Sequence, residues 1–67
     1  MTTEQKKTIA TVARIAVDKD FHQVVYLAAV GAILQADDWR NKAEEVISLA
    51  EKSKECDDFA EALFKIV

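Results

Sequence analysis

Proline is absent from this chain of 67 residues, and glycine, cysteine and histidine occur once each. An all-β fold needs many tight turns, which Gly and Pro usually build, so their scarcity disfavours a sandwich or barrel. Cys56 has no partner for an internal disulfide, which fits a reducing compartment. The opening residues MTTEQKKT contain no apolar run of the export-signal kind. We therefore expect a cytoplasmic protein.

The same scarcities disfavour most kinds of active site. A phosphate-binding loop needs several glycines, and a zinc site needs several Cys and His ligands. The Glu-x-x-His motif of di-iron bundles is absent. A nucleophilic site could be assembled only from Cys56, His22 and Asp57, and nothing in their spacing supports it. We therefore expect no catalytic residues, no metal, no cofactor and no enzymatic activity.

The most distinctive stretch is residues 24–34, VVYLAAVGAIL, which contains no charge and holds the only glycine. On a helical wheel its large and its small side chains both cover wide faces, and a helix that is apolar all round is normally buried all round. The stretch is too short to cross a membrane, which takes about 20 apolar residues. It therefore predicts a central helix, from Phe21 to about Ala36, surrounded by other helices.

The small side of this central helix carries Ala28, Ala32 and Ala36 at a constant spacing of four, with Gly31 nearby. Small side chains let a neighbouring backbone come close. We expect this side to pack tightly against another helix, so that Gly31 and Ala28 would touch a neighbouring backbone.

Apolar residues make up 51% of the chain, and helix-forming residue types dominate it. Apolar side chains at helical spacing predict three amphipathic helices around the central one: Thr3 to Val17, Trp39 to Ser53, and Phe59 to the end. The fold class is therefore all-α, a small bundle of about four short helices in one domain, residues 1–67.

Helix starts are indicated by side chains that can accept backbone N–H groups. Thr2 and Gln5 have the spacing of a capping box, although Thr3 could be the cap instead. An Asp followed by an aromatic residue recurs three times, and each Asp is a candidate N-cap: Asp20-Phe21, Asp38-Trp39 and Asp58-Phe59. Gln23 and Glu61 complete the capping-box spacing after Asp20 and Asp58.

A second architecture remains open because no Gly or Pro marks any joint between helices. An unbroken three-four alternation runs through Val46, Leu49, Ser53, Cys56, Ala60, Leu63 and Val67, so a continuous helix from Trp39 to Val67 would keep one face largely apolar. The chain would then be a long hairpin that turns at Asp37-Asp38. Such a hairpin would dimerise into a four-helix bundle.

The apolar side chains outnumber the inward positions that four short helices offer. A chain of this length also buries only about 60% of its unfolded surface, which leaves a thin margin of stability. We expect self-association, most simply as a dimer, through the large side of the central helix and the last helix. The residues expected there are Tyr26, Val30, Ile33, Leu34, Phe64 and Val67.

The function that fits these features is a small, acidic, non-enzymatic protein-binding module, an adaptor, inhibitor or regulator whose partners include itself. The alternative from another class is a nucleic-acid-binding regulator. The run Val12–Ala16 resembles the first helix of a helix-turn-helix, which implies DNA binding. However, Val17 stands where that turn needs Gly, and the following VVYLAAV has no side chains that read bases. With a net charge of −3, we expect no nucleic-acid partner.

Overall fold

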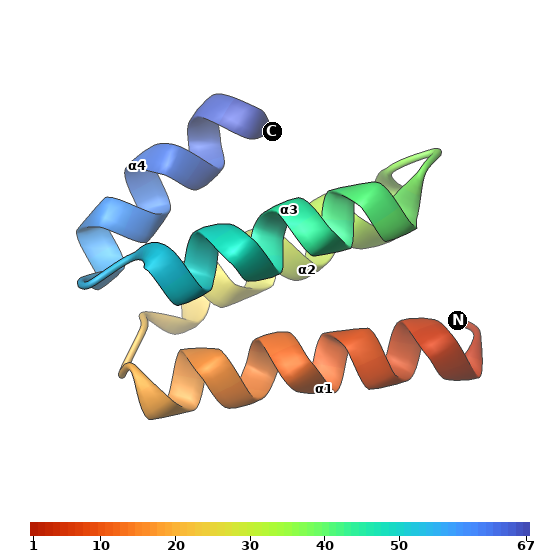
Figure 1. The fold of residues 1–67 in the computed structure, drawn as a ribbon, viewed down its shortest axis with the longest axis horizontal. Helices are drawn as coiled ribbons and strands as arrows, with labels where there is room; N and C mark the ends of the chain where they lie inside the picture. The colour runs from red at the N-terminus through yellow and green to blue at the C-terminus, as the bar shows by residue number, and fades with distance from the viewer.

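The computed structural model describes residues 1–67 and contains four helices and no strand (Figure 1). The helices are α1 (Thr3–Asp18), α2 (Gln23–Gln35), α3 (Trp39–Lys52) and α4 (Cys56–Ile66). The predicted all-α bundle of about four short helices is confirmed. The long hairpin is wrong, because the chain leaves the helix at both polar stretches, between α1 and α2 and between α3 and α4.

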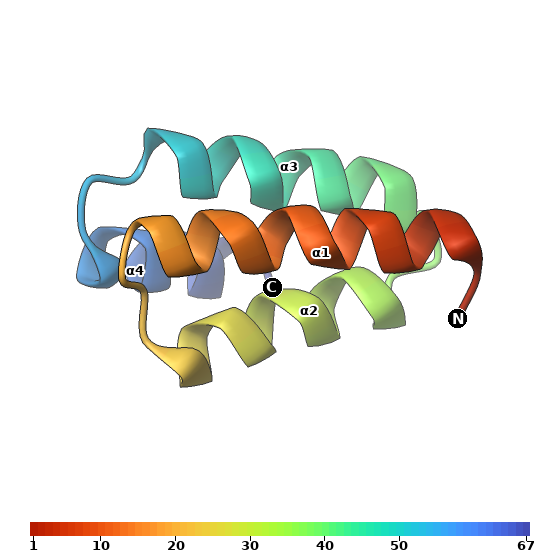
Figure 2. The same cartoon turned by 90° about the horizontal axis from the view of Figure 1, so that it is seen from below.

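The helices α2 and α3 form the centre of the bundle, and α1 and α4 lie on opposite sides of this pair (Figures 1 and 2). Both outer helices contact α2 and α3, and they make no contact with each other. The last helix, α4, is the shortest and begins at the end of the bundle where α1 ends. It therefore covers only part of the α2–α3 pair.

One core joins all four helices. The largest fully buried side chains come from every helix and include Val12, Ile33, Val46, Phe59 and Leu63. The remaining buried apolar residues belong to the same cluster: Ala16, Phe21, Val25, Ala29, Ala43 and Ala50. The rings of Phe21 and Phe59 stack with centroids 5.0 Å apart, and this links the start of α2 to α4.

The central helix is covered on one side only. Val25, Ala29 and Ile33, each one turn after the last, are buried, whereas Val24, Leu27 and Leu34 are exposed. The expectation of a helix buried all round is therefore wrong. The reason is that α1, α3 and the short α4 all contact α2 from the core side, and no helix of this chain lies over its outer face.

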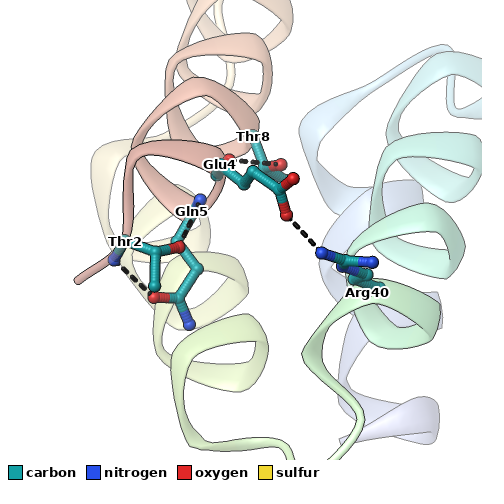
Figure 3. Close-up of polar contacts among 5 residues, drawn as sticks. All are labelled: Thr2, Glu4, Gln5, Thr8 and Arg40. Atoms are coloured by element: carbon teal, nitrogen blue, oxygen red, sulfur yellow. Dashed lines mark hydrogen bonds and ion pairs between the residues drawn. The ribbon is translucent and has the colours of Figure 1, made fainter.

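The first helix begins as the sequence predicts. The Thr2 side-chain oxygen accepts the backbone N–H of Gln5 at 3.1 Å, and the Gln5 side chain accepts the backbone N–H of Thr2 at 2.9 Å (Figure 3). This capping box satisfies two N–H groups that the helix leaves without partners. Glu4 forms an ion pair with Arg40 of α3 (Figure 3), but both groups are largely exposed, so the pair adds little stability.

Asp20 has a different role from the one predicted. It is the only non-glycine residue with positive φ, at 57°, and it follows the end of α1 rather than capping α2. The Asp20 N–H donates to the Val17 carbonyl at 3.1 Å and the Phe21 N–H donates to the Ala16 carbonyl at 2.8 Å. This is the Schellman pattern that ends helices, with Asp in the place usually taken by Gly. The cap of α2 is His22, whose Nδ1 accepts the Val24 N–H at 3.1 Å.

The two later caps also differ in part from expectation. Asp38 does precede α3, but its side chain accepts from the Asn41 side chain instead of from the helix backbone. Asp58 lies inside the first turn of α4, which begins at Cys56 after Glu55. Its predicted role as N-cap is therefore wrong. A carboxylate in the first turn still stabilises a helix through the helix dipole.

Lys19 joins the two loops at this end of the bundle. Its ammonium group donates to the carbonyl oxygens of Glu51 and Ser53, at 2.8 and 2.6 Å, at the C-terminus of α3. The same ammonium lies 5.9 Å from the centre of the Phe21 ring. A cation at the C-terminus of a helix complements the helix dipole. The loop after α1 is thereby held against the end of α3.

Candidate interaction surface

The outer face of α2 is an apolar stripe formed by the exposed Val24, Leu27 and Leu34 and the half-buried Gly31. At 3.6 residues per turn these positions share one face, opposite the buried Val25, Ala29 and Ile33. The exposed fractions are 62% for Val24, 55% for Leu27 and 37% for Leu34. The whole of α2 contains no charged residue. The helix thus presents an uncharged face to its surroundings.

The glycine of this stripe faces open space. A Cβ atom added at Gly31 would meet nothing within 4 Å. The predicted close approach of a neighbouring helix to Gly31 is therefore wrong within the single chain. Ala28 and Ala32 are half-buried, and the small residue of α2 that is fully buried is Ala29.

The neighbouring helix α4 and the residue that follows it add two more exposed apolar side chains. Phe64 is 61% exposed and Val67 is 69% exposed. The backbone N–H of His22 donates to the Cys56 sulfur at 3.0 Å, so α2 and α4 begin at the same end of the bundle, and α4 then runs at an angle to α2 and α3 (Figure 1). At 1.5 Å per residue, Phe64 lies about 12 Å along α4 from its start at Cys56.

The direction of the Phe64 side chain follows from its neighbours on α4. Ile66 lines a hollow with Leu49 and Lys52 of α3, so this side of α4 faces α3. Phe64 and Ile66 are two positions apart and therefore 200° apart around the helix axis, which turns Phe64 away from α3. We call Val24, Leu27, Gly31, Leu34, Phe64 and Val67 together the apolar surface.

The residues expected from the sequence to take part in association occupy three kinds of place. Leu34, Phe64 and Val67 are exposed and belong to the apolar surface. Val30 and Tyr26 are half-buried, and Tyr26 lines a recess between α1 and α2. Ile33 is fully buried in the core, so it contributes nothing to any surface of the folded chain.

Sequence reasoning missed Val24 and Leu27, although a signal for them was present. Both lie on the face opposite Val25 and Ala29. Leu27 follows Val24 by three residues and Leu34 follows Leu27 by seven, so the three side chains share one helical face. The periodicity of α2 is nearly absent because apolar residues fill every face. The pattern therefore does not reveal which face turns outward until the neighbouring helices are placed.

Two hollows elsewhere lack groups that converge on a ligand. An open recess of about 290 Å³ between α1 and α2 is mainly apolar, and Asp20 is its only charged residue. A wider hollow between α1 and α3 lies beside the exposed Glu4–Arg40 pair.

No group of three or more His, Cys, Asp or Glu side chains is placed to hold a metal ion. No helix is both long enough and apolar enough to cross a membrane.

The two most reactive side chains lie close together but are engaged in backbone contacts. The Cys56 sulfur accepts the backbone N–H of His22, and the imidazole Nδ1 of His22 accepts the N–H of Val24. Both side chains therefore help to define the start of α2. Neither is aimed into a cavity.

Comparison with protein-family models, with curated proteins and with solved structures finds no match to this chain. Five of the seven exposed large apolar side chains belong to the apolar surface.

Proposed function

We propose that this protein is a small non-enzymatic protein-binding module, an adaptor, inhibitor or regulator, that binds through the apolar surface and associates with itself. One observation carries the proposal: five large apolar side chains on two adjacent helices are 37 to 69% exposed. An apolar patch of a few hundred Å² is about the largest that a typical monomer exposes, and it is often a functional site. Such a patch is typical of a binding site for another protein.

The magnitude of the available free energy supports weak, reversible association. Full burial of a side chain of this size contributes about 1.5–3 kcal/mol, so five partly exposed ones supply roughly 4–8 kcal/mol per copy. Two copies supply twice this amount, and association itself costs about 4–15 kcal/mol. These two ranges overlap, so the net gain is small; we take about 5.5–7 kcal/mol as its working value, which corresponds to a dissociation constant on the order of 10–100 µM.

The surface suits an apolar partner better than a nucleic acid. Binding to phosphates requires Lys and Arg side chains, and α2 has none. The cytoplasm is the location we propose, because the single cysteine fits a reducing compartment.

The proposal is tested by sedimentation velocity and light scattering across a hundredfold dilution, from about 1 mM to about 10 µM, which brackets the expected dissociation constant. We expect the mass to rise above the 7.5 kDa of one chain as concentration increases. Leu27→Glu, which places a charge in the apolar surface, should remain monomeric.

The matched control is Ala10→Glu, which adds the same charge at an exposed position on α1. This variant should associate as the parent protein does. Equal association of Leu27→Glu and the parent would show that the apolar surface is not the binding site. A single-chain mass for the parent at every concentration would refute self-association.

A further inference from the structure

Gly31 has no explanation within the single chain. Its φ is not positive, and a Cβ atom at this position would meet nothing within 4 Å. Glycine is disfavoured inside helices relative to alanine. A glycine on an exposed helical face does, however, let another backbone approach closely. Its place in the middle of the apolar stripe therefore points to a partner helix that crosses α2 at this residue.

The stripe is self-complementary about Gly31. Leu27 lies four residues before Gly31, and Leu34 lies three residues after it. In a two-fold pair, if residue i contacts residue j, then j contacts i. An antiparallel crossing at Gly31 places Leu27 of each copy against Leu34 of the other, and the two glycines meet at the axis.

Phe64 fits the same arrangement. A two-fold axis perpendicular to α2 keeps both α4 helices on one side of the crossing. The exposed Phe64 side chains of the two copies therefore lie on the same side of the pair. A parallel pair would instead place each α4 beside the α1 side of the other copy.

The charges favour a second copy in this orientation. The chain has a net charge of −3, but α2 has no charge, so two copies can meet here without like charges in the contact. Asp37 and Asp38 follow the C-terminal end of α2. The antiparallel pairing brings them towards the positive N-terminal end of the other α2, whereas a parallel pairing sets the two acidic ends side by side.

The area fits a small dimer interface. At about 150 Å² for a large side chain, the five exposed ones present roughly 400 Å² per copy. With the half-exposed neighbours Val30 and Ala60 the contact reaches about 500 Å² per partner, which is below the range of stable interfaces and in the range of weak, transient ones. This is enough for a transient dimer.

We infer that a second copy of this chain docks antiparallel across α2, with the two-fold axis beside Gly31 and with Leu27 against Leu34 of the other copy. The inference rests on the proposed function, for which it names the partner and the arrangement.

Disulfide trapping tests the arrangement, with Cys56→Ser in all variants to remove the native thiol. A mixture of Leu27→Cys and Leu34→Cys chains, one of them carrying a mass tag, should form the mixed disulfide faster than either chain pairs with itself. Ala10→Cys, on the exposed face of α1, is the control and should pair only slowly. Faster self-pairing of Leu27→Cys than mixed pairing would indicate a parallel dimer and overturn the inference.

A second measurement uses Gly31→Leu, whose added side chain enters open space in the single chain. We expect an unchanged helical spectrum and at least a tenfold weaker association, about the effect of losing one good contact. Association equal to that of the parent would overturn the inference while leaving self-association intact. A parent protein that stays monomeric throughout would overturn both and would assign the surface to a different protein.

Discussion

Replacing Gly31 by alanine should stabilise the single chain. A glycine inside a helix is about 0.5–1 kcal/mol less favourable than alanine. Nothing in the fold offsets this gain, because the added Cβ meets no atom within 4 Å and the backbone needs no positive φ. For a domain of this size, 1 kcal/mol shifts the melting temperature by about 4–8 °C, so we expect a rise of about 2–8 °C.

The assay is thermal and urea unfolding followed by circular dichroism at about 5 µM, below the expected dissociation constant. The urea m-value should not change, because the surface exposed on unfolding is the same. Ala10→Gly, at an exposed position of α1, is the reverse control and should destabilise by a similar amount. At high concentration the gain from Gly31→Ala should shrink, because the methyl group weakens the dimer.

A lower melting temperature for Gly31→Ala at low concentration would refute this reasoning. It would mean that a neighbouring group lies against Gly31 and that the small side of α2 is packed, as the sequence pattern had suggested. An unchanged melting temperature at every concentration would also contradict it.

Three further predictions follow from the fold and one from the surface. Asp20→Gly should raise the free energy of unfolding by about 1 kcal/mol in urea titrations, since glycine relieves the left-handed conformation; a decrease would contradict the helix-end role. Lys19→Met should lower the free energy of unfolding by about 1–2 kcal/mol, because two carbonyl groups lose a charged donor. A loss below about 0.3 kcal/mol would show that this contact does not stabilise the fold. Leu63→Ala should cost about 2–5 kcal/mol and loosen α4, as judged by amide exchange; native protection along α4 would count against its place in the core. Finally, self-association should persist when salt is raised tenfold, whereas nucleic-acid binding would fall steeply.

The sequence predicts those parts of the fold that rest on periodicity. The regular spacing of Val12 and Ala16, and of Val46 and Ala50, identifies the buried faces of α1 and α3, and both are correct. The Thr2 capping box is also correct, because it depends only on residues three apart. These features are local or repeat at a fixed interval, so a single chain is enough to reveal them.

Other features depend on contacts between distant residues, and the sequence does not determine them. Asp is a good N-cap and also tolerates the left-handed conformation, so Asp20 fits either role at the same break. In α2 every face is apolar, and only the positions of α1, α3 and α4 decide that Ile33 is buried while Leu27 is exposed. The composition of α2 therefore predicts surplus apolar surface without locating it.

The central claim is that the apolar surface is where this protein meets another chain. The most direct measurement is a concentration series of ¹⁵N and methyl NMR spectra between about 10 µM and about 1 mM, which spans the expected dissociation constant. We expect chemical-shift changes confined to the apolar surface, with the largest changes at Leu27, Gly31 and Leu34 and a smaller change at Phe64. Spectra that do not change, or shifts centred on the exposed face of α1, would contradict it.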